Sequence, residues 1–298
     1  MMKKLAVVLA MAAAVGCGDG SSGSGGGKTT GDQIICYGRE NNSGTYMYFK
    51  EHVLATEDFA ADVQTLPGTA AVINAVSKDK ASIGYGGIGY VKGVRALKVK
   101  KDATSAAVDP SLDNVVNGSY PISRYLYLYT VGEPEGAVKH FIAWARGPMG
   151  QKICEEVHYY PLPGDKKGGD PGAAPQGKAT LTVKGSDTMV ILGQRWAEHY
   201  MKSNPDISIQ ITGGGSGVGI AALINGSTNI CQASRPMKAE EKKKVKDKHG
   251  KDPVEIAVAM DGLAVFVHES SKLQEISLPE LKSIYTGKVK TWSALAKP

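Results

Sequence analysis

Short apolar runs alternate with amphipathic segments along most of the chain, and this alternation constrains the fold more than any other feature. Thr180–Val183, Ile207–Ile211 and Asn229–Ala233 have the length and composition of strands. Between the first two runs, large apolar residues recur at helical spacing: Met189, Leu192, Trp196 and Tyr200. A strand–helix–strand order is typical of parallel sheets. The sequence therefore predicts an α/β fold with mainly parallel strands.

The alternation is interrupted once in the middle of the chain. Residues 164–178 are rich in Gly, Pro, Lys and Asp and have no apolar periodicity, which is typical of a linker. They separate a block at about 33–163 from a second block at about 179–298. A chain of 298 residues accommodates one large domain or two smaller ones, and its apolar content is sufficient for a core.

The N-terminus predicts export from the cytoplasm. Two lysines precede the apolar stretch Leu5–Val15, which is too short to span a bilayer. Small residues lead to Cys17, and the Gly/Ser-rich segment 17–32 is typical of a flexible tether. We therefore predict that residues 1–16 are a lipoprotein signal peptide and that Cys17 carries a lipid at the periplasmic or extracellular face of the cell envelope. An ordinary signal peptide, with Cys17 incidental, is the alternative.

Composition and spacing exclude several classes of function. The formal charge of +6 falls to +4 without the two leader lysines, and this mild balance does not indicate a nucleic-acid binder. Cys36, Cys154 and Cys231 remain after the leader, so at least one has no partner within the chain. The six histidines lack the HxxH or HExxH spacing of metal sites. We expect a monomer without a metal or cofactor.

Three junctions between a predicted strand and a predicted helix share one composition. They are Lys184–Thr188, Gly213–Gly217 and Gly38–Thr45, and each combines Gly with Ser or Thr hydroxyls. Glycine allows close backbone approach, and the first turn of a helix has free N–H groups that attract anions. Arg39 adds a positive charge with a planar fork of donors. One such junction is most simply a helix cap, but three of them with an arginine predict an anion site.

Two glycine motifs imitate nucleotide-binding loops. Gly84–Gly89 fits GxGxxG after a strand, but no regular helix pattern follows it. Residues 27–29 read Gly-Lys-Thr, yet they lie in the predicted tether, and Ser22 stands where a P-loop needs Gly. The sequence also contains no GxSxG nucleophile elbow. These observations favour a small anion over a dinucleotide.

At these motifs the sequence resembles the PstS family, the phosphate-binding proteins of bacterial ABC phosphate importers. The resemblance covers nearly the whole chain after the leader. Five segments resemble the first half of the family: Thr182–Thr188, Thr212–Gly217, Ala233–Met237, Asp261–Val265 and Tyr285–Lys288. Four segments resemble its second half: Gly38–Tyr46, Gly84–Gly86, Tyr120–Arg124 and Gly150–Ile153.

The two halves stand in reversed order, so the chain resembles a circularly permuted member of the family. Joining Pro298 to Ile34 would restore the family order, and the linker 164–178 would then bridge what are ordinarily the two termini. Domain termini often lie close together at the surface, which is why such permutations are tolerated.

The resemblance implies a type II periplasmic-binding-protein fold, in which two α/β domains are joined by hinge strands and the ligand lies in the cleft between them. Carried onto this chain, one domain would hold residues 34–86 and 277–298. The other would hold residues 87–276, including the linker. The hinges would lie near Tyr85–Tyr90 and Phe266–Ser271.

The resemblance also implies a set of phosphate-binding residues. They come from the three junctions and from one further strand end: Ser186, Asp187, Thr188, Ser216, Ser234, Arg235, Arg39, Ser43, Gly44 and Thr45. Ser234 and Arg235 stand where many members have an Asp that accepts the proton of hydrogen phosphate, a proton that sulfate lacks. This departure leaves the basis of selectivity open. Asp187, Glu40 and Asp261 are candidate substitutes, although the position of Asp261 inside an apolar strand favours a structural role.

We therefore predict an extracytoplasmic binding protein, not an enzyme. It would capture inorganic phosphate between two lobes and deliver it to the permease and ATPase of an ABC importer. A binder of another oxyanion, such as sulfate, molybdate or a phosphate ester, is the first alternative. A phosphoesterase is a weaker one, because the sequence offers no metal cluster or activated nucleophile. A surface sensor or adhesin without transport partners is the last.

Overall fold

The computed structural model describes residues 32–90 and 93–295. The predicted signal peptide, Cys17 and the tether up to residue 31 lie outside the described residues. Within the described part, no helix has the length and apolar character needed to cross a membrane.

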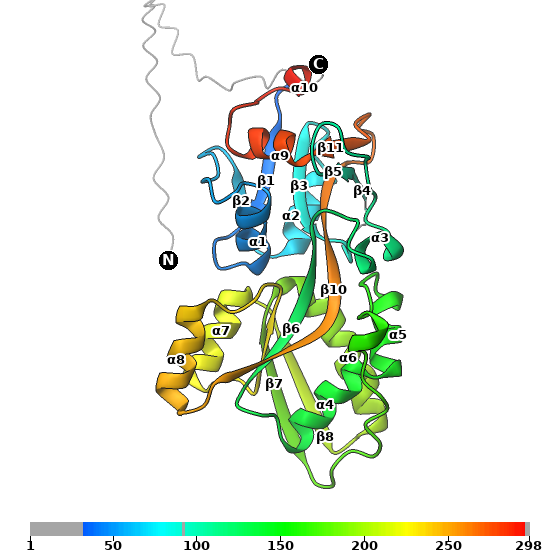
Figure 1. The fold of residues 1–298 in the computed structure, drawn as a ribbon, viewed down its shortest axis with the longest axis vertical. Helices are drawn as coiled ribbons and strands as arrows, with labels where there is room; N and C mark the ends of the chain where they lie inside the picture. Colours follow the sequence, from blue (N-terminus) through cyan, green and yellow to red (C-terminus); the bar gives the residue numbers. More distant parts are fainter. Residues whose placement is uncertain (1–31, 91–92, 296–298) are drawn as a thin grey trace, which may run out of the picture. The chain divides into compact units, whose positions relative to one another are not determined.

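Nine of the described strands form one sheet, in which two parallel groups are joined by two antiparallel strands (Figure 1). The order along the sheet is β2 (Gln64–Leu66), β1 (Ile35–Arg39), β3 (Ser82–Gly87), β10 (Pro253–His268), β6 (Ser123–Val131), β9 (Ile230–Ala233), β7 (Ala179–Gly185) and β8 (Ile207–Thr212). A short strand, β4 (Val94–Ala96), also pairs with β10. Two further strands, β5 (Lys98–Lys100) and β11 (Glu275–Ser277), form a separate parallel pair.

The predicted α/β class is confirmed, and the parallel pairing lies within the two outer groups of the sheet. β2, β1 and β3 are parallel, as are β9, β7 and β8. The pairs in the middle, β3 with β10, β10 with β6 and β6 with β9, are antiparallel. The helical connections predicted from periodicity account for the parallel groups.

The long strand β10 and its neighbour β6 connect the two groups (Figure 1). The C-terminal part of β10, Leu263–Val267, pairs with β3, while Pro253–Gly262 pairs with β6. The register of β10 against β6 shifts between Ala257 and Ala259, which marks a bulge. Because one strand joins both groups, its residues lie at the boundary between them.

Buried apolar side chains divide the described residues into two lobes. Lobe 1 (residues 32–90, 93–125 and 260–295) surrounds one cluster that includes Phe49, Tyr85 and Phe266 and that Tyr160 also joins. Lobe 2 (residues 126–259) has a cluster on each face of its sheet, one including Trp196 and the other Leu223. Met260 and Val258, only two residues apart on β10, belong to different clusters, so the chain passes between the lobes at this point.

The division into lobes differs from the predicted domain boundaries at residues 86/87 and 276/277. Leu97, Val99 and Ile122 are buried in the lobe 1 cluster, as are Leu263–Val267 and Ile276. The predicted hinge segments, near Tyr85–Tyr90 and Phe266–Ser271, therefore fall within lobe 1. The chain instead passes between the lobes on β6 and β10. The sequence did not predict this, because short apolar runs do not reveal which of two cores they join.

The helices cover these sheets and begin at recognisable caps. Lobe 1 contains α1 (Gly44–His52), α2 (Thr69–Val76), α3 (Leu112–Val116), α9 (Leu278–Tyr285) and α10 (Trp292–Leu295). Lobe 2 contains α4 (Gly136–Arg146), α5 (Pro148–Glu156), α6 (Val190–Ser203), α7 (Ser216–Asn225) and α8 (Ala239–His249), with short 3₁₀ turns at Gly164–Lys166 and Asp187–Met189. Ser277 and Glu280 form a capping box at α9. α8 is a strongly charged helix, of which only Val245 is buried.

The first and last described segments lie side by side in lobe 1. Gln33 and Thr291 form an antiparallel bridge, and the Ile34 N–H donates to the Lys290 carbonyl at 2.9 Å. The Trp292 N–H in turn donates to the Asp32 carbonyl at 2.9 Å.

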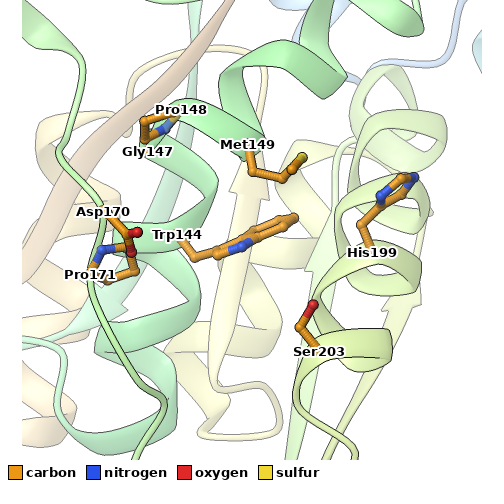
Figure 2. A pocket seen from close by; sticks show the side chains of 8 residues that line it. All are labelled: Trp144, Gly147, Pro148, Met149, Asp170, Pro171, His199 and Ser203. Atoms are coloured by element: carbon orange, nitrogen blue, oxygen red, sulfur yellow. The ribbon is translucent and has the colours of Figure 1, made fainter.

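The linker packs on lobe 2. The Gly168 N–H donates to the Arg146 carbonyl at 2.8 Å, and His140 Nε2 lies 3.1 Å from the Gly172 carbonyl oxygen. Asp170 and Pro171 face Trp144 and His199 across a pocket of about 380 Å³ (Figure 2). The linker thus follows a defined course over α4 and α6, although its sequence has no apolar periodicity.

Candidate functional site

The three predicted junctions meet at the boundary between the lobes. Ser43 caps α1 in lobe 1, and its hydroxyl accepts from the Thr45 and Tyr46 N–H groups. A Cβ atom placed on Gly44 would lie 2.3 Å from Ser216 Oγ and 2.6 Å from Ser234 Oγ, both in lobe 2. Gly44 is therefore required for the start of α1 to approach the start of α7 this closely.

The remaining junction joins the same cluster through the hydroxyl of Thr188. Thr188 Oγ1 and Thr45 Oγ1 share a hydrogen bond of 2.8 Å between the lobes. Ser186 Oγ is buried and has no hydrogen-bond partner among the described residues. A second contact across the boundary runs from the Gly217 N–H to the Asn42 carbonyl, at 2.9 Å. We define the donor cluster as Ser43, Gly44, Thr45, Ser186, Thr188, Ser216 and Ser234.

Arg39 lies beside the donor cluster and is 1% exposed. Its Nη2 donates to Asp187 Oδ2 of lobe 2 at 2.9 Å, and its Nε donates to Glu40 Oε2 at 3.0 Å. Its Nη1 donates to Thr69 Oγ1 at 2.8 Å. Burial alone would raise the pKa of Glu40, but the hydrogen bond and positive charge of Arg39 lower it below its ordinary value. The guanidinium is thus held in one orientation by partners on three sides.

Asp187 holds the two lobes together. Besides Arg39, its carboxylate accepts from the Gly214 N–H at 2.8 Å, and its carbonyl accepts from the Tyr90 hydroxyl at 2.9 Å. Both carboxylate oxygens therefore have donors in this structure. Asp187, in the Lys184–Thr188 junction, thereby connects Gly214 of the second junction with Arg39 of the third.

Arg235 is the predicted ligand that the structure does not bring to the donor cluster. Its Nη1 and Nη2 donate to the Glu241 carboxylate at 2.8 and 2.7 Å, and Nη1 also reaches the Pro236 carbonyl. Glu241 lies in the first turn of α8, where a carboxylate also caps the free N–H groups of the helix. Its neighbour Ser234 does lie in the cluster, where its N–H donates to Ser216 Oγ at 3.1 Å.

The chain is similar to proteins of one family of binding proteins. The family model for the PBP superfamily domain matches residues 25–147 and 171–298. The phosphate-binding protein PstS 2 of Streptococcus agalactiae serotype V is 32% identical over 247 residues, which cover 80% of this chain and 77% of the relative. The PstS 2 protein of Streptococcus pneumoniae serotype 4 is 29% identical over 266 residues, 86% of each chain.

The chain belongs to the PstS family. A crystal structure of a phosphate-binding protein of a phosphate ABC transporter from Streptococcus pneumoniae TIGR4 matches with a TM-score of 0.65 and 27% identity. That match covers 88% of this chain and 99% of the other. The α/β periplasmic-binding-protein fold and the family expected from the sequence motifs are thereby confirmed, and the circular permutation stays a prediction.

In this PstS-family chain, sequence reasoning missed one residue beside the donor cluster. Arg124 of β6 donates through Nη2 to Thr45 Oγ1 at 2.9 Å and to Asp261 Oδ2 of β10 at 2.7 Å. The two residues stand directly opposite each other in the β6–β10 register. Burial raises the pKa of Asp261, although the charge and hydrogen bonds of Arg124 act in the opposite direction. A signal was present, since Arg124 is the only charged residue of β6 and Asp261 lies within the apolar part of β10.

Two other expectations for this PstS-family chain concern metals and thiols. Among residues 32–90 and 93–295, no group of three or more His, Cys, Asp and Glu side chains could hold a metal ion. Cys36, Cys154 and Cys231 are free thiols, and burial raises the pKa of Cys36 to about 12. Burial thus disfavours the thiolate form, which is the nucleophilic form of cysteine.

Proposed function

We propose that the protein captures inorganic phosphate between its two lobes outside the cytoplasm and delivers it to an ABC importer. The observation that carries this proposal is the donor cluster itself. Helix starts from both lobes, four serine hydroxyls, two threonine hydroxyls and the guanidinium of Arg39 gather at one boundary. Helix N-termini and charge-assisted donors favour a compact anion.

The energies of such contacts are sufficient for capture. Hydrogen bonds to charged groups contribute roughly 1.5–3 kcal/mol each, and micromolar affinity needs about 8 kcal/mol net. Several converging donors reach that value after the cost of ordering both lobes. The names of the relatives in two Streptococcus species support phosphate as the anion.

Calorimetry tests the proposal directly. We expect purified protein to bind phosphate with micromolar or tighter affinity and to bind sulfate, molybdate and phosphate esters more weakly. Absence of binding heat at millimolar phosphate would refute it. Tighter binding of another of these anions would assign the same site to that ligand, and turnover of a chromogenic phosphoester would support an enzyme instead.

Selectivity for phosphate requires an acceptor for its proton, and three carboxylates are candidates. Glu40, Asp187 and Asp261 each accept a hydrogen bond from an arginine in this structure. Replacing each by its amide keeps the shape and removes the charge. The variant in which the preference for phosphate over sulfate falls most identifies the acceptor.

We further propose that Cys17 anchors the protein to the membrane as a lipoprotein and that it acts as a monomer. The support is the sequence of the leader, in which small residues precede Cys17 and a Gly/Ser-rich segment follows. A Cys17→Ser variant should be released from the membrane fraction, and the purified protein should elute as a single chain. Retention of the variant in the membrane would contradict the anchor, and elution as a dimer would contradict the monomer.

We also propose that the chain is a circular permutation of the family order. The support is the reversed order of the motifs together with the bridge between Gln33 and Thr291. The test is a chain opened within the linker 164–178, with residues 295 and 33 joined by a short Gly/Ser segment. We expect this rearranged chain to fold and to bind phosphate with unchanged affinity. Failure to fold would indicate that the present order is required.

A further inference from the structure

Arg124 is fixed at the point where the chain passes between the lobes. Its Nε and Nη2 donate to Asp261 Oδ2 at 3.0 and 2.7 Å, while the Ile88 N–H donates to Asp261 Oδ1 at 3.2 Å. The side chains of Arg124 and Asp261 are 2% and 0% exposed. A buried pair with this geometry holds the plane of the guanidinium in a single orientation.

One nitrogen of this guanidinium, Nη1, has no hydrogen-bond partner for its N–H groups in the described structure. The edge formed by Nε and Nη2 faces Asp261, and the edge formed by Nη1 and Nη2 faces Thr45, whose hydroxyl accepts from Nη2 at 2.9 Å. Nη1 lies on that second edge, is buried and has no hydrogen-bond partner. Because the guanidinium is planar, one N–H of Nη1 points roughly parallel to the bond from Nη2 to Thr45.

The direction of that N–H leads toward the donor cluster. Thr45 belongs to the first turn of α1, and its hydroxyl also contacts Thr188 of lobe 2. The Tyr48 ring covers one face of the guanidinium, with 5.3 Å between Cζ of Arg124 and the ring centroid. A partner for Nη1 must therefore approach in the plane of the guanidinium, beside Thr45.

We propose that Arg124 is a second guanidinium at the anion site, with Nη1 donating to the bound anion. The proposal rests on the proposed function and extends it, since it adds a charged donor to the one that the sequence identified. Arg39 already shares its donors among Glu40, Asp187 and Thr69. Arg124 faces one carboxylate only and keeps a free donor. A buried donor without a partner is costly, and an anion beside Thr45 supplies that partner.

The test compares Arg124→Lys with Arg95→Lys by phosphate calorimetry. Lysine keeps the charge opposite Asp261 but cannot present a planar fork. Arg95 is the matched control, because it also has a buried nitrogen without a partner, yet its donors reach Ser271 and Leu273, far along the chain from the cluster residues. We expect Kd to rise at least about tenfold in the first variant and to stay within about twofold in the second.

Thermal unfolding separates binding from a purely structural role. If Arg124 only fastened the crossing strands, Arg124→Lys would lower the melting temperature and leave Kd unchanged, which overturns the proposal while the proposed function stands. If Arg124→Lys does not fold, a crystal structure of the natural chain with phosphate decides. A phosphate oxygen within about 3.2 Å of Nη1 supports the proposal, and any other partner for Nη1 overturns it.

Anion binding by the natural chain separates an error in the proposed function from an error in the role of Arg124. If it binds sulfate or molybdate and not phosphate, the proposed ligand is wrong, and the same pair of variants is measured with the anion that does bind. If it binds none of these anions, both the function and the role of Arg124 are refuted.

Discussion

The two lobes bring different chemistry to the boundary between them. Lobe 1 brings charge, because Arg39 is turned toward lobe 2 and meets Asp187 there. Lobe 2 brings mainly hydroxyls, from Ser186, Thr188, Ser216 and Ser234. Arg235, the residue after Ser234, donates to Glu241 of the same lobe. If an anion binds as proposed, its charged contact comes from Arg39 of lobe 1, and hydroxyls of both lobes supply its neutral contacts.

The difference between Arg39 and Arg235 comes from the position of their carboxylate partners. Arg39 is the last residue of β1 and Arg235 follows β9 by two residues; both are buried, and both pair with a carboxylate. The partner of Arg235 is only six residues away and caps the following helix, so the pair closes within lobe 2. Arg39 has a partner 148 residues away in the other lobe. Arg39 is therefore held at the boundary between the lobes, whereas Arg235 is held within lobe 2.

Removing the Arg39 guanidinium of lobe 1 should have the largest effect on anion affinity. Arg39→Ala deletes a charged donor and leaves Glu40 and Asp187 without a counter-charge beside the site. We expect a loss of at least about 2 kcal/mol, roughly 30-fold in Kd, measured by calorimetry with phosphate. Arg195→Ala, an exposed pair with Glu198 on α6, is the matched control and should change Kd little. Near-normal affinity of Arg39→Ala would show that lobe 1 does not supply the charge.

Preventing the lobes from meeting should have the next largest effect. In Gly44→Ala, the new methyl group would lie 2.3 Å from Ser216 Oγ and 2.6 Å from Ser234 Oγ, so the lobes cannot approach as they do here. Overpacking of this kind typically costs 1–3 kcal/mol, and we expect about a tenfold rise in Kd. Small-angle scattering should show less compaction on adding phosphate.

A second glycine provides the control for that variant. Gly164→Ala adds the same methyl group where no atom lies within 4 Å, so affinity and compaction should be unchanged. If Gly44→Ala bound phosphate as tightly as the control, the contact between the starts of α1 and α7 would not be part of the bound state.

Local sequence features predicted the elements and the junctions, because both depend on neighbouring residues. The periodicity of Trp196 and Tyr200 identified α6, and the apolar residues on either side of each junction identified the strands. The division between lobes could not be predicted this way. Ile122, just before β6, and Leu126 within it are four residues apart, yet they are buried in different cores.

The site was predictable to the extent that its chemistry lies in turns. Glycine, serine and threonine at a helix start are visible in the sequence, and Ser43, Thr45 and Ser216 do lie together. The orientation of a long side chain is not visible, because it depends on distant partners. Arg124 was not predicted as a site residue, yet it donates to Thr45 of the cluster. Arg235 was predicted as one, yet it donates to Glu241.

Removing the Arg235 guanidinium of lobe 2 should change phosphate affinity little, in contrast to removing Arg39 of lobe 1. Arg235→Ala removes a guanidinium whose outer donors are both used by Glu241. We expect phosphate affinity to change by less than about threefold, while the free energy of unfolding falls by roughly 1–3 kcal/mol because Glu241 loses its partner. Calorimetry and urea unfolding measure the two quantities. A loss of affinity as large as that of Arg39→Ala would place Arg235 in the site after all.

The pairing of Arg235 with Glu241 should appear in the pH dependence of stability and not in binding. Burial alone would raise the pKa of Glu241, but its hydrogen bond to Arg235, the backbone of Lys238 and nearby positive charge lower it below the ordinary value of 4.5. The pair therefore stabilises the fold above that ordinary value, and this contribution is lost as the pH falls through the lower folded-state pKa. Glu241→Gln should weaken the acid dependence of the unfolding free energy, whereas Glu240→Gln, one residue earlier and exposed, should leave it unchanged. Because neither variant touches lobe 1, phosphate affinity at neutral pH should stay constant in both. A change of affinity confined to Glu241→Gln would mean that the Glu241 carboxylate acts on the anion through Arg235.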